Sequence, residues 1–440
     1  MTDNQLRYAA LDAATLLWLR DAQFPLLAGN GLLRAAALEF ECVPATADLQ
    51  YAGMPFDRET WEGLREQEED ALAAAVRDLE ECFAPVASGQ LRLFERLTVN
   101  PDSPQQVLQA LRSMGADIPD TRDTTLALLA QQGGPAGRAA EAVLRYRRHA
   151  KRLSAFIEPY LEHVHPKTGR IHAEYRQLNP NGVGRFSSSN PNIQQVVRGD
   201  AFRRAFRAPE GRALVIADYA AIEMRIMAWL SGDPTLIEIF RTGADPHRRT
   251  ASLIMGKPED EVTKEERQAA KAAGFGLIYG MSAGGLQLYA STAYGVKMTK
   301  EEAQRFREGF FRAYAGVARW HHRQDRVARK RREIRTASGR ARRWASSDMP
   351  STQLYNSPDQ GTGADILKRA MARLRPHLKR LGAELVASVH DELVVECDED
   401  RAEEVAEVVK REMEAAGEEF IAPVPVEVEV GVGKTWADKA

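Results

Sequence analysis

The sequence predicts an α+β fold in which a mostly helical block is inserted between the strands of one core. Two apolar segments predict buried strands: RALVIADY at 212–219, which ends in an acid, and ELVASVHDELVVECD at 384–398, which has a polar tip. A third segment, PVEVEVGVG at 425–433, alternates apolar and polar residues and predicts a further strand. The residues between the acidic strand ends, roughly 235–380, follow a mostly helical pattern.

The first part of the chain is predicted to form helices joined by short breaks. Residues 58–83 have the apolar spacing of a long amphipathic helix. Ser103 is placed to cap a second helix that ends near Gly115. The segment QQGGPAG at 131–137 predicts a flexible loop, and residues 138–163 resume a helical pattern.

Two polar segments follow these helices. HPKTGRIHAEY at 165–175 resembles a hairpin with Lys167–Gly169 at its turn. GVGRFSSSNPNIQQ at 182–195 surrounds Arg185 with groups that could hydrogen-bond sugar edges or a minor groove. An ordinary polar loop has a similar composition, so this segment alone leaves both interpretations open.

Composition limits the class of protein. The 440 residues suggest about two to four compact units, and a formal net charge of −2 means that any nucleic-acid-binding surface has to be local. The three cysteines, Cys42, Cys82 and Cys397, are far apart, which argues against a zinc site or a disulfide scaffold. No apolar run predicts a membrane span and no signal-peptide layout opens the chain. A cytoplasmic protein without a membrane partner is expected.

Two carboxylates at strand ends are the main catalytic candidates. Asp218 closes the strand at 212–219, and Asp391 lies at the tip of 384–398 between His390 and Glu392. Each alone has a bland alternative, a solvated strand-end or turn acid. Together, on neighbouring strands, they could hold two Mg²⁺ ions about 4 Å apart for in-line phosphoryl displacement.

A helix at 267–280 carries a candidate triphosphate-binding face. Arg267, Lys271, Phe275 and Tyr279 recur every four residues and so fall along one helical face, with cations at one end and aromatics at the other. Cations suit phosphates and a ring suits a base or sugar. A solvated amphipathic helix is the alternative. The clustered glycines Gly274, Gly276 and Gly280 weigh against it, because alanine would stabilise a purely structural helix.

Two basic segments are candidate DNA contacts. Ten of the 21 residues at 323–343 are Lys or Arg, opposed only by Asp325 and Glu333, and a phosphate backbone would relieve their repulsion. Residues 147–152 form a smaller patch that includes Arg147 and Lys151. A solvated charged helix face is the alternative for both.

These segments, taken together and in order, resemble the family A DNA polymerases of the bacterial DNA polymerase I type. The resemblance runs from about residue 39 to the C-terminus. DYAAIEMR (218–225) resembles motif A of that family, RQAAKAAGFGLIYG (267–280) resembles motif B, and VHDELVVE (389–396) resembles motif C. GRFSSSNPNIQQ and YNSPDQGTGAD (355–365) match two further family segments.

The resemblance implies a right-hand fold with an antiparallel-sheet palm, helical fingers and a helical thumb. The thumb would span 58–155 and the fingers 229–355. The palm would comprise 39–57, 156–228 and 356–440, preceded at 1–38 by a remnant of the 3′–5′ exonuclease domain.

The resemblance also implies roles at the active site. Asp218, Asp391 and the Tyr219 carbonyl would hold two Mg²⁺ ions, for which Mn²⁺ can substitute. One ion would activate the primer 3′-hydroxyl and the other would bind the triphosphate. Lys271 would protonate the leaving group. The dNTP-binding residues would be Arg267, Lys271, His247, Phe275, Tyr279 and, as a steric gate against the ribose 2′-hydroxyl, Glu223. Phenylalanine at 275 accompanies discrimination against dideoxynucleotides in the family.

The partners implied are primer–template DNA and dNTPs, bound by a monomer. The DNA-binding residues would be Arg185, Asn356, Gln360, His390, Glu392, Lys151 and Arg147. Three departures from the family pattern, at Ala220–Ala221, Gly274 and Thr352, remove neither a metal ligand nor a phosphate-binding cation.

The segment YAALDAATLLWL at 8–19 resembles the last motif of the family's exonuclease domain, in which Tyr8 and Asp12 would bind metal. The earlier acids of that domain have no counterpart before this segment, so no proofreading is expected. A single-subunit RNA polymerase and an inactive nucleic-acid-binding scaffold are the competing functions. Glu223 and the His390–Glu392 triplet favour deoxynucleotides over the first, and intact metal ligands argue against the second.

Overall fold

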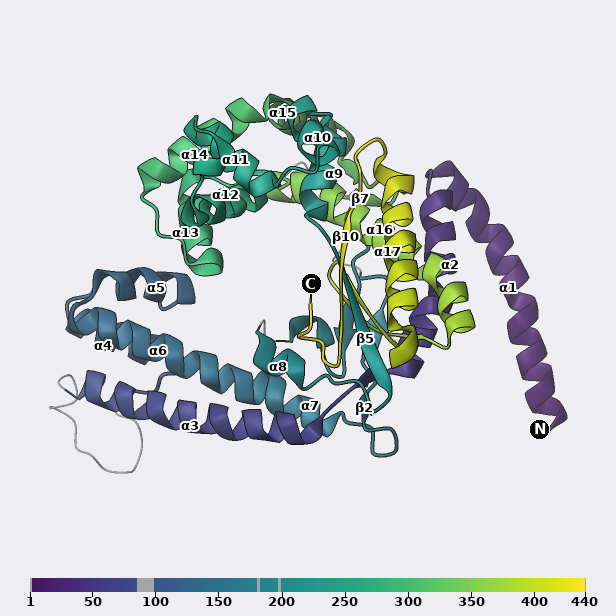
Figure 1. Cartoon of the computed structure of the whole chain (residues 1–440), viewed down its shortest axis with the longest axis horizontal. Coiled ribbons are helices and arrows are strands. Elements are labelled where there is room, and N and C mark those ends of the chain that lie inside the picture. Colours follow the sequence, from purple (N-terminus) through teal and green to yellow (C-terminus); the bar gives the residue numbers. More distant parts are fainter. Residues whose placement is uncertain (1, 85–98, 180–182, 197–198, 347, 440) are drawn as a thin grey trace.

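The computed structural model describes the whole chain except residues 1, 85–98, 180–182, 197–198, 347 and 440. Gly182, the first residue of the polar segment around Arg185, is outside this range. The described chain has the α+β architecture that the sequence predicted: one antiparallel sheet surrounded by helices. Figure 1 shows these elements arranged around a central opening, with one group of helices above it, a second group below it and the sheet along its side.

The central sheet has the strand order β10-β5-β9-β8. Its strands are β5 (Arg212–Tyr219), β8 (Glu384–Val389), β9 (Glu392–Asp398) and β10 (Val428–Gly433), and every neighbouring pair is antiparallel. The predicted strands at 212–219 and 384–398 are confirmed. β10 begins three residues later than predicted, because Pro425 has no N–H for a ladder hydrogen bond.

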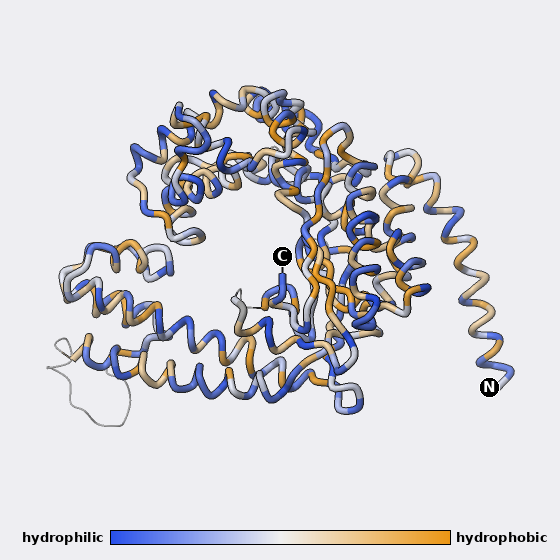
Figure 2. Tube along the Cα trace, viewed as in Figure 1, coloured by the Kyte–Doolittle hydropathy of each residue, from blue (hydrophilic) through white to orange (hydrophobic). Residues whose placement is uncertain are grey.

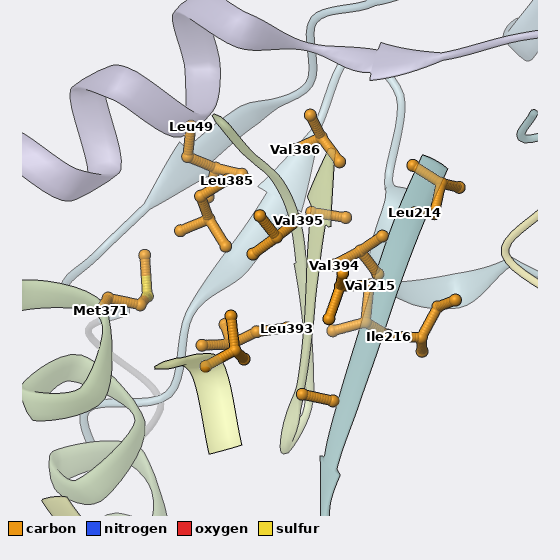
Figure 3. Close-up of a cluster of buried hydrophobic side chains, with 14 of the residues drawn as sticks. Leu49, Leu214, Val215, Ile216, Met371, Leu385, Val386, Leu393, Val394 and Val395 are labelled. Atoms are coloured by element: carbon orange, nitrogen blue, oxygen red, sulfur yellow. The ribbon is translucent and has the colours of Figure 1, made fainter. Parts of the chain in front are cut away.

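Helices α2 (Leu33–Ala52), α16 (Ser351–Leu381) and α17 (Ala402–Ile421) cover one face of this sheet. Leu49 of α2 and Met371 of α16 are buried against strand residues such as Leu385 and Val395 (Figure 3). The strands form the most continuously hydrophobic part of the chain trace (Figure 2). Complete burial of each such aliphatic side chain contributes roughly 1.5–3 kcal/mol, so this layer fixes the strands rigidly.

A second group of helices packs on its own core above the opening. Its members are α9 (Ile222–Ser231), α10 (Pro234–Arg241), α11 (Pro246–Met255), α12 (Lys264–Leu277), α13 (Ala283–Tyr294), α14 (Lys300–Ala313) and α15 (Ala315–Arg331). Asp233, Asp245 and Thr263 begin three of them by accepting hydrogen bonds from backbone N–H groups. The short hairpin of β6 (Glu333–Arg335) and β7 (Ala341–Arg343) follows α15.

The third group lies below the opening. It contains α3 (Arg58–Phe83), α4 (Pro104–Ser113), α5 (Asp123–Gln132), α6 (Gly134–Arg152), the π-turn Leu153–Ile157 and α7 (Glu158–Glu162). The helix at 58–83 and the Ser103 cap are confirmed. The prediction of a flexible loop at 131–137 is wrong, because α5 runs to Gln132 and α6 starts at Gly134. Positive φ at Gly133 makes the sharp junction, and a proline in the first turn starts the next helix.

The segment between this group and the sheet is only partly as predicted. A turn closes at Gly169, whose N–H bonds His165 O at 2.9 Å. The predicted hairpin is present as a short one: Val164 and Ile171 form an antiparallel bridge, and the His165 N–H donates to Arg170 O at 2.9 Å. The strand after the turn, β2 (Arg170–Ile171), also pairs along its length with β1 (Met54–Pro55). β3 (Glu174–Arg176), β4 (Ser187–Ser189) and α8 (Asp200–Arg204) complete this segment.

Helix α1 (Asp3–Gly29) extends away from the rest of the molecule (Figure 1). It buries none of its residues, and Tyr8 is 71% exposed. Tyr8 and Asp12 are therefore part of an isolated helix in the described structure.

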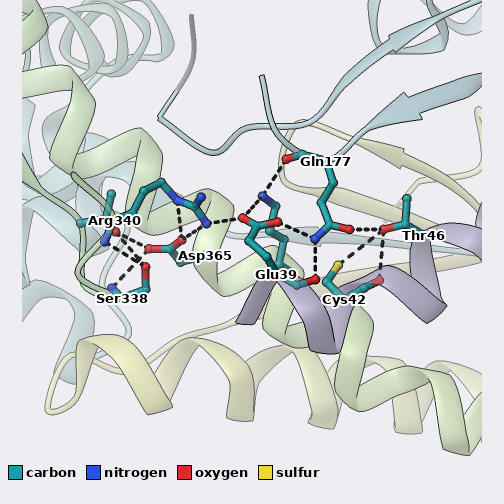
Figure 4. A network of polar contacts seen from close by, with 9 residues as sticks. Glu39, Cys42, Thr46, Gln177, Ser338, Arg340 and Asp365 are labelled. Atoms are coloured by element: carbon teal, nitrogen blue, oxygen red, sulfur yellow. Dashed lines mark hydrogen bonds and ion pairs between the residues drawn. The ribbon is translucent and has the colours of Figure 1, made fainter. Parts of the chain in front are cut away.

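A buried polar network joins α2, α16 and the β6–β7 hairpin (Figure 4). Glu39 accepts from Lys368 Nζ at 2.6 Å and also pairs with Arg340, which in turn bonds Asp365 at 3.0 Å. Gln177 donates to the backbone oxygen of Glu39 at 2.7 Å. Lys368 has no exposed surface, and each charge in the network faces an opposite charge.

Candidate active site

Asp218 and Asp391 are brought together by strand pairing. Asp218 is paired with Glu392 in the β5–β9 register, so the residue before Glu392 lies beside it. The backbone N–H of Tyr219 donates to Asp391 O at 3.4 Å. His390 and Asp391 form the two-residue turn between β8 and β9, and His390 has the unusual φ of +59°. Left-handed backbone at a non-glycine residue is costly and often accompanies a functional site.

The two carboxylates repel one another in a buried setting. Burial, followed by the charge of Asp218, raises the pKa of Asp391 from 3.8 to about 7. Asp218 Oδ1 is buried and has no hydrogen-bond partner among the described residues. An orphaned carboxylate oxygen beside a second acid is the donor chemistry that a divalent cation satisfies. The residues present therefore fit a bound Mg²⁺ or Mn²⁺.

Lys439 is a neighbour of this pair that sequence reasoning missed. Its Nζ lies 3.0 Å from Asp218 Oδ2 and also pairs with Glu392. No local motif signals this lysine, since its position depends on the packing of Trp436 after β10. Glu392, predicted as a DNA contact, is only 2% exposed and is also held by Arg203 at 3.2 Å and by the Trp436 indole N–H. A buried carboxylate with these partners supports the turn at Asp391 and is not presented to DNA.

The α12 side chains face these acids across a cleft of about 960 Å³. Arg267, Lys271 and Phe275 line it from the helix. Tyr279 also lines it, although α12 ends at Leu277, so this residue belongs to the following turn rather than to the helical face. The predicted set is brought together, with one member displaced from the helix.

Asp245 and His247, at the start of α11, complete this wall of the cleft. Asp245 begins α11 and accepts from Arg267 Nε at 2.7 Å, which fixes the guanidinium. Its DPH sequence is an N-cap signature, but nothing local indicates its partner. His247 is buried, and its ring centroid lies 5.7 Å from that of Phe275. Burial, then the Lys271 charge, lowers the pKa of His247 to about 4, so the imidazole is neutral at neutral pH.

The glycines of this segment allow close packing inside the protein. Cβ atoms at Gly274 and Gly276 would contact methionine sulfurs at 3.5 Å and 3.1 Å, so these positions permit close internal packing. Gly280 has φ +74°, and a Cβ there would come within 2.7 Å of the Tyr355 ring. A protein side chain makes a close approach at each of the three glycines.

The remaining predicted residues divide between two sites. The cleft contains Arg185, Asp218, Tyr219, Glu223, His247, Arg267, Lys271, Phe275, Tyr279, Asn356, Gln360, His390 and Asp391. Lys151 and Arg147 instead line a separate groove of about 1560 Å³ between α5 and α6. Arg147 donates to Thr121 O at 2.6 Å there. The tips of α5 and α13 meet where Gln131 Nε2 donates to Ser291 Oγ at 2.8 Å.

Several cations of the basic run at 323–343 are paired within the protein, so fewer of them are available to bind DNA than the composition indicates. Asp325 pairs with Arg329, and Glu333 pairs with both Arg335 and Arg343. Arg340 belongs to the buried network of Figure 4. The exposed cations of the run are concentrated near the end of α15 and include Arg326, Lys330 and Arg331.

An acidic strand pair opposite a cationic helix, on a sheet flanked by two helical groups, defines a nucleotide-polymerising enzyme of right-hand architecture. Comparison with known proteins agrees. The family model described as DNA polymerase family A matches residues 65–438, and the chain belongs to that family.

Named relatives are DNA polymerases. The chain is 35% identical to DNA polymerase I of Aquifex aeolicus over 99% of this chain and 76% of that protein. It is 41% identical to the thermostable DNA polymerase I of Thermus aquaticus, over 67% of this chain and 36% of that protein. DNA polymerase I of Pseudomonas aeruginosa is 34% identical, over 98% of this chain and 47% of that protein. The chain thus spans less than half the length of the last two relatives.

A solved structure supports the same assignment. The POL domain of Pol1 from M. smegmatis, in complex with DNA primer-template and dNTP, has a TM-score of 0.83 and 32% identity, covering 97% of this chain and 75% of that one. The right-hand α+β fold is therefore confirmed, and the chain is a DNA-directed DNA polymerase. Among the described residues, no helix combines the length and apolar character needed to cross a membrane.

Proposed function

We propose that this polymerase extends a DNA primer with dNTPs by two-metal-ion nucleotidyl transfer. The observation that carries the proposal is the cleft in which Asp391 and the unpartnered Asp218 Oδ1 face Lys271 and Arg267. Family A polymerases use divalent metal ions, and two acids opposite two cations suit a metal-bound triphosphate.

Asp218, Asp391 and the Tyr219 carbonyl would hold Mg²⁺, with Mn²⁺ able to substitute. When bound, the ions supply activation of the primer 3′-hydroxyl and neutralisation of charge on the departing pyrophosphate. Within the described residues, no group of three or more His, Cys, Asp or Glu side chains forms a metal cluster.

The helical wall binds and orients the triphosphate. Arg267, fixed by Asp245, and Lys271 bind its phosphates, and Lys271 is placed to donate a proton to the leaving group. Neutral His247 adds a hydrogen bond without adding charge. Phe275 packs on the sugar, and Glu223 excludes the ribose 2′-hydroxyl.

DNA is expected to bind along the rest of the opening. Arg185, Asn356, Gln360 and His390 line the cleft beside the acids and are proposed to contact the primer terminus and minor groove. Lys151 and Arg147 are proposed to contact the backbone from the thumb, which we assign to 58–155. The fingers are assigned to 229–355, the palm to 39–57, 156–228 and 356–440, and the remnant to 1–38.

We expect these 440 residues to act as a cytoplasmic monomer without proofreading. Tyr8 and Asp12 lie on a helix that buries none of its residues, and two groups on one exposed helix do not make a two-metal site.

Primer extension with Mg²⁺ tests the proposal. Asp391→Ala is expected to abolish extension, whereas Asp398→Ala, at the exposed far end of the same strand β9, is expected to retain it. Full activity in Asp391→Ala would refute the two-metal assignment. Preferential use of rNTPs by the unaltered chain would refute the substrate assignment.

A further inference from the structure

A buried acid lies behind the proposed gate and has no role in the mechanism above. Asp359 is on α16, directly before Gln360, and has no exposed surface. The Tyr279 hydroxyl donates to Asp359 Oδ1 at 3.2 Å. Asp359 Oδ2 has no partner among the described residues. Burial of an acid with an unsatisfied oxygen is costly, so the position calls for a functional explanation.

The same tyrosine also interacts with Glu223: burial raises the pKa of the Glu223 carboxyl, and the Tyr279 hydroxyl opposes this shift. Burial, then the charges of Asp359 and Glu223, raise the pKa of Tyr279 well above its ordinary value. Glu223 is on α9, Tyr279 follows α12, and Asp359 is on α16, so one hydroxyl joins three separate elements. Glu223 and Asp359 also line a common cavity of about 270 Å³ beside the cleft, together with Arg185 and Asp391. A substitution at Asp359 can therefore alter the position of the Glu223 carboxylate without altering a contact with the substrate.

We propose that Asp359 is a positioning residue for sugar selection: it fixes the Tyr279 hydroxyl, which in turn fixes the Glu223 carboxylate. The inference rests on the proposed role of Glu223 as the gate against a 2′-hydroxyl. Asp359 itself does not touch the nucleotide.

Counting protons gives the direction of this chain of hydrogen bonds. One phenolic proton cannot be donated to two carboxylates at once, so Tyr279 bonds both acids together only when one of them carries its own proton. Burial, followed by the charge of Glu223, raises the pKa of Asp359 well above its ordinary value. Protonation of Asp359 reverses the direction of its bond with Tyr279: the carboxyl then donates to the Tyr279 oxygen, which leaves the Tyr279 proton for Glu223. A held carboxylate leaves less space for a 2′-hydroxyl than a mobile one.

The test is the ratio of kcat/KM for a dNTP to that for the matching rNTP, measured on one primer–template with the full chain. Asp359→Leu is expected to lower this ratio by about 2- to 10-fold, the equivalent of one net hydrogen bond. Asp359→Asn, whose amide can still donate to Tyr279, is expected to stay within about 2-fold of the unaltered enzyme. The ratio is insensitive to the fraction of enzyme that is folded, because both rates scale with it.

Ser357→Ala is the matched control. Ser357 is buried on the same helix but bonds Arg342 at 2.9 Å instead of Tyr279, so its removal should leave the ratio unchanged. Tyr279→Phe removes the hydroxyl from the middle of the chain. It is expected to lower the ratio, and adding Asp359→Leu to it should lower the ratio no further. Additive effects would overturn the proposal.

Asp359→Ala carries the same expectation as Asp359→Leu and replaces it if the leucine prevents folding. An unchanged ratio in these folded variants overturns the role of Asp359. If Glu223→Ala also leaves the ratio unchanged while extension proceeds, the gate assignment fails, and this proposal fails with it. Absence of extension by the unaltered chain would instead refute the proposed function itself.

Discussion

Two clusters of acids in this polymerase have opposite surroundings. Around Glu39 and Asp365, every carboxylate faces a cation: Lys368 lies at 2.6 Å from Glu39, and Arg340 bridges the two acids. In the cleft, the charge of Asp218 acts on Asp391, and Lys439 is the one cation of the described chain that pairs with Asp218. Both clusters contact the same central sheet or its covering helices.

The difference indicates which acids stabilise the fold and which acids are available to bind a cation. Compensated charges in the Glu39 network stabilise one arrangement of α2, α16 and the β6–β7 hairpin, because losing either partner would leave the other charge buried. In the cleft, the negative charge of Asp218 and Asp391 exceeds the positive charge beside it, and a bound cation would balance the difference. Four predictions test this contrast between the two clusters.

Asp391→Asn should have the largest effect, on activity alone. We expect primer extension to fall by roughly 10³-fold or more, as when one member of a catalytic unit is removed. The melting temperature of the metal-free enzyme should stay constant or rise, because a repelling charge is lost. Extension kinetics and calorimetry on the same preparation measure both. A strongly destabilised variant would instead show that Asp391 stabilises the fold, as the acids of the Glu39 network do.

Glu39→Gln should have the reverse effect, on stability. Removing this charge leaves Lys368 buried without an anion and leaves Arg340 with Asp365 alone, which costs about 3–5 kcal/mol. Chemical denaturation measures the loss, and kcat of the remaining folded enzyme should be nearly unchanged. Glu41→Gln is the matched control on the same helix: this half-exposed partner of Arg369 should cost about 1 kcal/mol or less.

The pH dependence of stability should also distinguish the clusters. A carboxyl whose folded-state pKa is raised from 3.8 to about 7 keeps its proton longer in the folded chain than in the unfolded one. Its contribution to the stability of the metal-free enzyme therefore decreases as pH rises from about 4 to about 7. Melting temperatures at pH 5.5 and 8.5 should differ less in Asp391→Asn, and Mg²⁺ should restore the unaltered enzyme at pH 8.5. Identical profiles for both proteins would contradict the coupling of the two acids.

The smallest effect concerns exposed charge, which belongs to neither cluster. Lys330→Gln should weaken DNA binding slightly and reduce the slope of log affinity against log salt by about 1. Arg335→Gln should change the slope less, because Glu333 already holds this guanidinium at 2.7 Å. Binding titrations at several salt concentrations provide the measurement. Equal slopes for Lys330→Gln and the unaltered chain would exclude this lysine as a phosphate contact.

The sequence was most informative where local pattern decides structure. β5 and the β8–β9 hairpin follow from apolar runs that end at acids, and the Ser103 cap follows from one residue type at one position. The spacing of Arg267, Lys271 and Phe275 was sufficient to group three cleft residues. Such features depend on neighbours within a few residues.

Contacts between distant segments escaped prediction. Lys439 reaches Asp218 across 221 residues, and Asp359 meets Tyr279 across 80. The number of free cations in the basic run was overestimated for the same reason, since Arg340 pairs with Glu39 across 301 residues and is largely covered. The error at 131–137 was local: Gly-Gly-Pro was interpreted as a loop, but it provides a one-residue junction and a helix start.

The network around Glu39 also sets an order of assembly. Helices α3 to α7 contact one another over modest sequence separations and can form while synthesis continues. Helix α2 emerges earlier, but its partner Lys368 follows it by 329 residues. The chain must therefore keep the apolar face of α2 without its final partners until α16 has been made. Helix α2, although synthesised early, is therefore among the last elements to reach its final packing.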